Sequence, residues 1–155
     1  MARKTTTVTI TDPGRDNGKS FFVTEMSADQ AESWGMRALL ALAKSGVTLP
    51  PDIEKSGLAG AASMGLKALS GLPWDAAKPL LDEMFGCVKC IPDPGKPHIT
   101  RPLIEDDIDE VKTRLKLRME VWNLHTGFLM AARTQISGSA AAVIQGQSTT
   151  ATSAA

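Results

Sequence analysis

The chain of 155 residues has little of several features that mark particular classes of protein. Aromatic residues make up 5% of it and tyrosine is missing, so a hydrophobic core must consist mainly of aliphatic side chains and methionine. Lysine and arginine number 17, as do aspartate and glutamate, so the chain lacks the basic surplus of most nucleic-acid-binding domains. Nucleic acid is therefore not an expected partner.

Long apolar runs are also lacking. No 18 apolar residues follow one another without a charge, and the N-terminal stretch MARKTTTVTITDPGRD has no apolar segment of signal-peptide length. Two cysteines are too few for a disulfide framework. We therefore expect a cytoplasmic protein with no membrane partner. Its 43% hydrophobic and 22% charged residues are typical of a globular chain.

The first residues predict a β-hairpin. Residues 7–11 and 20–25 are rich in β-branched and aromatic side chains, and the segment between them is rich in turn formers. Within that segment Asp16, Asn17 and Gly18 suit a chain reversal, through Asx-type hydrogen bonds and positive φ angles.

Helical patterns follow the hairpin. Ser27 and Gln30 have the spacing of a capping box, which predicts a helix from there to about Lys44. The Gly- and Ala-rich segment 57–72 keeps its leucines at helical spacing. We expect a helix there that packs in the core or lets another helix approach closely.

The next segment predicts a third helix and two short extended stretches. Asp75 is expected as the helix N-cap, Pro79 in its first turn, and Gly86 at its end. Residues 88–91 and 98–104 then have the composition of strands and could pair as a second hairpin, although their prolines favour edge positions.

The longest predicted element is the last. The acidic cluster 105–110 and the basic residues that follow match the dipole of a helix, which is expected to continue to about Ile136. Its apolar stripe comprises Ile108, Val111, Leu115, Met119, Trp122 and Leu129.

Together these patterns predict an α+β fold that is mostly helical, with one or two β-hairpins and a long C-terminal helix. A single domain is expected over residues 1–136. The uncharged segment 137–155 is expected to be a disordered polar tail.

Residues with catalytic or metal-binding chemistry are few. Cys87 and Cys90 form a CxxC pair, but a zinc site needs two more ligands, and His98 and His125 are too far apart in sequence for a finger. A redox CxxC sits at a helix N-terminus, whereas this pair follows a predicted helix end. We interpret His125 as a structural or solvent-facing residue.

Other motifs also lack the surroundings that catalysis or nucleotide binding requires. The carboxylates of 105–110 are typical of a solvated helix start. The stretch that ends in Gly18, Lys19 and Ser20 lacks the first glycine of a phosphate-binding loop. The sequence therefore predicts no catalytic residue, no cofactor and no metal, and favours a binding or assembly protein over an enzyme.

Three segments resemble the tail assembly chaperones of long-tailed bacteriophages. They are residues 21–42, 71–93 and 101–128, which contain VTEMSA before a helix, a central LLDEM, and EDDI at the start of the long helix. The resemblance implies a non-enzymatic protein that binds the tape measure protein before the tail tube polymerises. It would act in the cytoplasm of the infected bacterial host and be absent from the mature virion.

The resemblance also implies a longer product. In this family a translational frameshift near the end of the gene often yields a second protein that recruits major tail tube subunits. The polar composition from Ser137 is compatible with such a junction.

The final helix supplies the candidate binding residues. An amphipathic helix can cover the apolar stripes of a helical partner, and Trp122, Phe128, Leu129 and Met130 are the expected anchors. The competing interpretation places all four in the domain's own core. Self-association is also expected, because the long helix needs a partner surface.

Two other functional classes stay open. A structural virion component, such as a tail tube or head-to-tail joining protein, would use the hairpins to extend a sheet between copies. A small regulatory nucleic-acid binder is disfavoured by the balanced charge.

Overall fold

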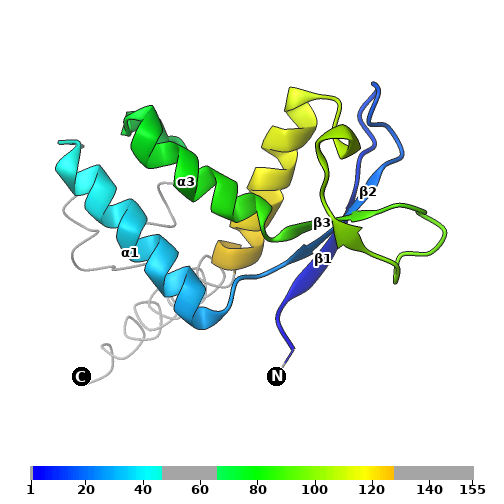
Figure 1. Ribbon diagram of the computed structural model, residues 1–155, viewed down its shortest axis with the longest axis horizontal. Helices are drawn as coiled ribbons and strands as arrows, with labels where there is room; N and C mark the ends of the chain where they lie inside the picture. Colours follow the sequence, from blue (N-terminus) through cyan, green and yellow to red (C-terminus); the bar gives the residue numbers. More distant parts are fainter. Residues whose placement is uncertain (1, 47–65, 128–155) are drawn as a thin grey trace, which may run out of the picture.

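Four short segments, most of them rich in β-branched or aromatic residues, form a four-stranded antiparallel sheet. The computed structural model describes residues 2–46 and 66–127. The strands are β1 (Thr5–Thr9), β2 (Ser20–Thr24), β3 (Val88–Ile91) and β4 (Arg101–Pro102), in the order β1-β2-β3-β4. The sheet lies at one end of the molecule, and the helices α1 (Ala28–Lys44) and α3 (Trp74–Phe85) extend from the other (Figure 1).

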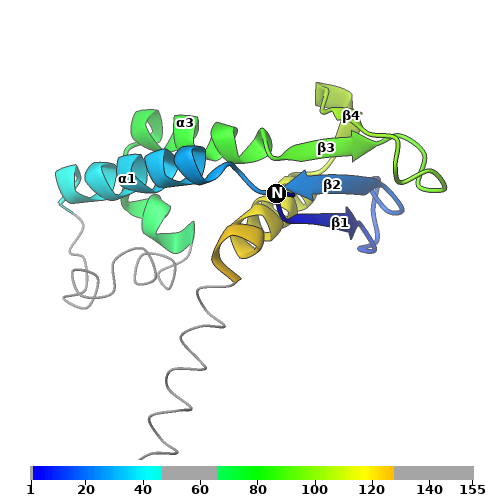
Figure 2. The ribbon, with the colours of Figure 1, turned by 90° about the horizontal axis from the view of Figure 1, so that it is seen from below.

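The remaining elements are two short 3-10 helices and a third α-helix. The 3-10 helices are η1 (Leu66–Gly71) and η2 (Glu105–Asp107). Residues 111–127 are helical up to the end of the described part. Figure 2 shows α1 and α3 side by side and the 111–127 helix passing along the sheet.

The predicted fold class is wrong. Both expected pairs form, β1 with β2 and β3 with β4, but β2 also pairs with β3, so the strands make one sheet and not separate hairpins. Helix accounts for 50% of the described part and strand for 15%, so that part is not mostly helical and is only roughly α+β. Pairing of β2 with β3 joins strands far apart in the sequence, and such a contact leaves no local pattern.

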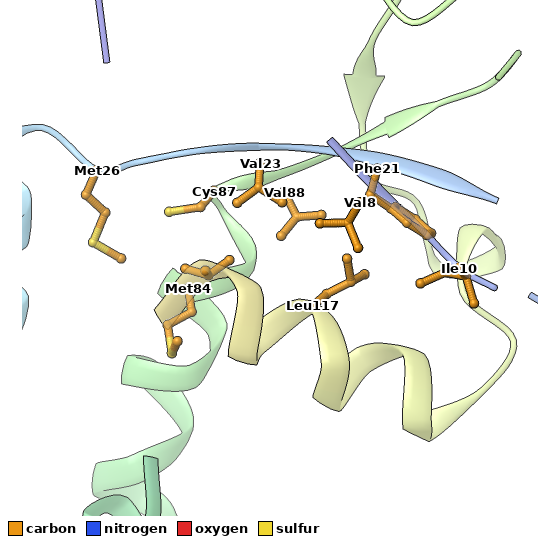
Figure 3. Close-up of a cluster of buried hydrophobic side chains, with 10 residues drawn as sticks. Val8, Ile10, Phe21, Val23, Met26, Met84, Cys87, Val88 and Leu117 are labelled. Atoms are coloured by element: carbon orange, nitrogen blue, oxygen red, sulfur yellow. The ribbon is translucent and has the colours of Figure 1, made fainter. Parts of the chain in front are cut away.

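The main core lies between one face of the sheet and the 111–127 helix. The register places Val8 opposite Phe21, and Val23 opposite Val88, so that their side chains form rows on the same face. Figure 3 shows these side chains directed toward Leu117 on the helix. Phe21, Val23 and Leu117 are completely buried, so this contact excludes water from the centre of the fold.

A second, smaller core joins the helices. Ala38 of α1, Leu69 of η1 and Leu80 of α3 form a buried cluster. The indole N–H of Trp34 donates to the carbonyl oxygen of Leu80 at 2.9 Å, and the rest of that side chain contacts both cores. Trp34 therefore joins the helical end of the molecule to the sheet end.

The prediction for α1 is confirmed. The helix ends at Lys44, and the Ser27 hydroxyl accepts from the backbone N–H of Gln30 at 3.2 Å. The reciprocal half of the capping box is replaced, since the Gln30 side-chain amide donates to Glu83 on α3 at 3.3 Å.

Other predicted boundaries differ from the structure. Pro73, rather than Asp75, is the N-cap of α3, and Asp75 lies in its first turn with Pro79 further inside. The strand expected over 98–104 is reduced to two residues, as its prolines suggested. Of the helix predicted over 57–72, residues 57–65 lie outside the described residues.

The last helix starts later than predicted. The acidic cluster does not form its first turn: Glu105–Asp107 is a separate 3-10 helix, and the α-helix begins at residue 111. The expected end at Ile136 and the predicted tail 137–155 lie outside the described residues.

Two leucines on this helix give a direct test of the core. We expect Leu117→Ala to lower the free energy of unfolding by about 2–5 kcal/mol, because it opens a cavity at a fully buried site. Leu115→Ala is the matched control, since that side chain is 55% exposed, and should change stability by less than about 0.5 kcal/mol. Urea unfolding followed by circular dichroism measures both, and equal losses would contradict the assigned orientation of the helix.

Candidate binding surface

The 111–127 helix carries apolar side chains on two sides. Leu117 and Val121 face the sheet, whereas Val111, Leu115 and Met119 are 73%, 55% and 45% exposed. The exposed three are spaced by four residues, so they stack along one side of the helix. We call these three side chains the exposed stripe. An apolar row of this kind on a helix surface is typical of a protein contact site.

Trp122 lies one turn beyond the exposed stripe but is not free. Its ring is half-buried, packs against the main core, and meets the Trp34 ring edge to face, with 6.0 Å between ring centroids and an interplanar angle of 64°. The structure therefore places this predicted anchor in a contact with α1. The other three predicted anchors, Phe128, Leu129 and Met130, lie outside the described residues.

Two arginines lie beside the exposed stripe. The guanidinium carbons of Arg114 and Arg118 are 4.3 Å and 4.8 Å from the centroid of the Phe85 ring of α3. Burial, and then the charge of Arg114, lower the pKa of Arg118. Within the described ranges neither arginine has a carboxylate at ion-pair distance. This flank of the stripe is therefore electropositive.

An open groove of about 850 Å³ lies beside Arg114. It is formed by the end of α3, by β3 and by the segment that leads into the last helix. Its lining combines charged side chains, Lys89, Glu105 and Arg114, with apolar ones, which are Phe85, Val88, Pro102, Leu103, Ile104 and Ile108. Ile104 is 59% exposed, so apolar surface continues from the groove to the start of the helix.

Asp16 fixes the start of the last helix. Its two carboxylate oxygens accept hydrogen bonds from the backbone N–H groups of Asp109 and Glu110, each at 3.0 Å, and Lys19 donates to it at 2.8 Å. Burial by itself would raise the pKa of Asp16, but these hydrogen bonds, led by that of Lys19, hold the pKa well below its usual range. The carboxylate thus serves as an N-terminal cap supplied by a distant loop.

The sequence predicted Asp16 only as a turn residue and not as the cap of the last helix. Gly14 in the same loop has a φ of 149°, and a Cβ there would overlap the Glu110 carboxylate. Lys116 also binds this loop, at 2.9 Å from Asp12. No local sequence pattern predicts such contacts, because aspartate and glycine are common residues in turns.

Asp107 and Asp109 of the acidic cluster make structural contacts. Asp107 accepts two hydrogen bonds from the Arg101 guanidinium, at 2.6 Å and 2.7 Å, and Arg101 lowers the pKa of Asp107. Asp109 pairs with Lys19 at 2.7 Å. Lys19 is therefore bound to carboxylates, and Ser20 next to it shares a hydrogen bond with Thr9 at 2.9 Å.

The cysteines are buried thiols. Burial raises the pKa of Cys87 to about 11 and also raises the pKa of Cys90. A high pKa opposes formation of the thiolate that redox chemistry and metal binding require. Among the described residues, no three His, Cys, Asp or Glu side chains lie where they could hold a metal ion together.

His125 joins the last helix to the entry of α1. Its Nε2 accepts from the backbone N–H of Met26 at 2.8 Å, and its Nδ1 lies 2.7 Å from the Val121 carbonyl oxygen. Since Nε2 is an acceptor, Nδ1 carries the hydrogen and donates it. His98, by contrast, is exposed in the loop between β3 and β4.

Comparison with known proteins gives no relative. No protein-family model, no curated protein and no solved structure matches this chain. A search of the described residues for helices that could cross a membrane found none long and apolar enough.

Asp16→Asn tests the cap. The asparagine amide has one acceptor oxygen, whereas the backbone N–H groups of Asp109 and Glu110 each need an acceptor. We therefore expect the free energy of unfolding to fall by about 1–3 kcal/mol near pH 7. Because the pKa of Asp16 is lowered on folding, its contribution is present above pH 3.8 and is lost as the pH falls further. The difference between the wild type and the variant, measured by urea unfolding, should therefore shrink below pH 3.8.

Asp106→Asn is the control for this substitution, since Asp106 is an exposed member of the acidic cluster. Its effect should stay within about 0.5 kcal/mol. Equal effects of the two substitutions, or a difference that does not change with pH, would contradict the assigned cap.

The buried thiols give a second test. At pH 7.5 we expect iodoacetamide to modify Cys87 in the folded protein at least about tenfold more slowly than in urea, because burial and the raised pKa both limit thiolate attack. Mass spectrometry of timed samples measures the two rates. Equal rates would show that Cys87 is accessible and reactive.

Proposed function

We propose that this protein is a tail assembly chaperone of a long-tailed bacteriophage, which binds the tape measure protein and helps to recruit tail tube subunits without enzymatic activity. The observation that supports it best is the exposed stripe of Val111, Leu115 and Met119, on the helix whose entry carries the EDDI resemblance. A tape measure protein is a long helical chain with apolar stripes of its own. Packing of helix against helix would cover both surfaces.

The stripe defines how such a chaperone would work. It extends over nine residues, with about 12 Å of helix between the first and the last, and so covers only a short segment of a long partner. Several copies would therefore have to bind along one tape measure chain. In this proposal the exposed stripe takes the anchoring role first given to Trp122, while Phe128, Leu129 and Met130 stay predicted contacts.

The remaining parts of the proposal rest on the family resemblance. The protein acts in the cytoplasm of the infected host and is absent from the mature virion. A frameshifted longer product brings in the major tail tube protein. Neither nucleic acid nor a membrane is a partner.

One observation favours a second candidate, a structural component of the virion. In the part of the chain that the structure describes, β1 pairs with β2 alone, so its other edge offers unpaired backbone groups. Such an edge can accept a strand from another copy, as a tail tube or joining protein would require.

Co-expression with the tape measure protein from the same genome tests the proposal. We expect the tape measure protein to become soluble and to co-purify with this chain, because the chaperone covers its apolar stripes. An insoluble tape measure beside a soluble, unbound chain would contradict the proposal. Mass spectrometry of purified particles then separates the two candidates, since a virion component is present in stoichiometric copies.

A further inference from the structure

The charges around the exposed stripe indicate what kind of helix fits it. Arg114 and Arg118 lie one turn apart on one flank, and both guanidinium groups share the ring of Phe85. The Nε of Arg118 is buried and finds no acceptor among the described residues. Two like charges are thus held together beside an apolar surface, and the exposed side chain of Arg114 has no carboxylate partner among the described residues.

The basic residues on the opposite flank of the exposed stripe are already paired with carboxylates. Lys112 lies 3.5 Å from the Glu110 carboxylate, and Lys116 lies 2.9 Å from that of Asp12. These lysines are neutralised within the fold. The arginine flank is therefore where a partner could contribute carboxylates.

We propose that the face formed by Val111, Leu115, Met119, Arg114 and Arg118 binds an amphipathic helix of another protein, whose apolar side covers the exposed stripe and whose carboxylates pair with the two arginines. Carboxylates suit this site because they accept guanidinium hydrogen bonds in a fork geometry. This inference deepens the proposed function and rests on it, since it specifies the chemistry of the helical partner.

This face does not suit pairing with itself. The carboxylates next to it, Glu110 and Asp12, already pair with Lys112 and Lys116, so the same face of a second copy would bring no unpaired carboxylate to Arg114 and Arg118. Residues 128–155 contain Arg133 and no acidic residue, so they cannot supply the carboxylates either. Segment 47–65 holds Asp52 and Glu54 and is the alternative occupant that the experiment must address.

The test uses a fluorescein-labelled 18-residue helical peptide with leucines at i, i+4 and i+8 and glutamates along one flank. Its matched control replaces the glutamates with lysines. Fluorescence anisotropy on the full chain should show that the glutamate peptide binds at least about tenfold more tightly than the lysine peptide. Added salt should reduce the difference in affinity between the two peptides, because it screens exposed charge pairs.

Substitutions locate the binding face. Leu115→Ser with Met119→Ser should weaken binding of the glutamate peptide at least about tenfold. The matched control is Met36→Ser with Leu40→Ser on α1, where the side chains are 53% and 64% exposed and binding should not change.

The arginines are tested in the same assay. Arg114→Gln with Arg118→Gln should remove the preference for glutamate over lysine peptides. Arg114→Lys with Arg118→Lys should keep that preference, since the charges stay. Circular dichroism confirms that each variant is folded before binding is measured.

Several outcomes would overturn the inference: no binding, equal binding of both peptides, or equal loss in the α1 control. If the wild type fails to bind while Asp52→Asn with Glu54→Gln restores binding, the occupant is the chain's own segment and the inference is wrong.

The inference and the proposed function fail separately. Co-purification of the tape measure protein that survives Leu115→Ser with Met119→Ser overturns the inference alone. Peptide binding at this face without co-purification of the tape measure protein supports the face and overturns the function.

Discussion

The buried carboxylate of Asp16 determines how the last helix lies on the sheet. It accepts the backbone N–H groups that precede residue 111, and so ties the start of that helix to the loop between β1 and β2. With the start fixed, Leu117 and Val121 reach the sheet and fill the main core. This orientation of the helix about its axis leaves Val111, Leu115 and Met119 on the outside. The candidate binding face and the core therefore depend on one set of hydrogen bonds.

Keeping that face exposed costs stability that the fold could otherwise gain. Complete burial of one large aliphatic side chain is worth about 1.5–3 kcal/mol, and three such side chains lie in solvent on this helix. Helices of globular domains usually confine apolar residues to one stripe. A second stripe next to two arginines held on Phe85 is therefore better explained by a partner than by the needs of this domain.

The elements that could be predicted are those with local causes. Ser27 caps α1 through a hydrogen bond to its own helix, and residues 88–91 have the composition expected of a strand. The single sheet could not be predicted, because the contact between β2 and β3 joins distant segments. Nor could the cap of the last helix, since Asp16 lies more than ninety residues before the N–H groups that it binds.

The same reasoning explains the candidate site. Periodicity placed Val111, Leu115 and Met119 in one stripe, but the side of the helix that faces solvent depends on the position of the sheet. Trp122 was one of the expected anchors on this helix, and its contact with Trp34 depends on how α1 packs. Local pattern therefore identifies the members of such a surface, and tertiary packing decides which of them a partner can reach.

The two indole rings of Trp34 and Trp122 also have an optical consequence. At 6.0 Å and 64° their electronic transitions are close enough to couple, so the near-ultraviolet optical activity of the protein depends on the contact between α1 and the last helix. Trp74, 66% exposed at the start of α3, contributes the separate signal of a solvated indole. The chain thus contains a built-in spectroscopic reporter for the position of the helix that carries the candidate binding face.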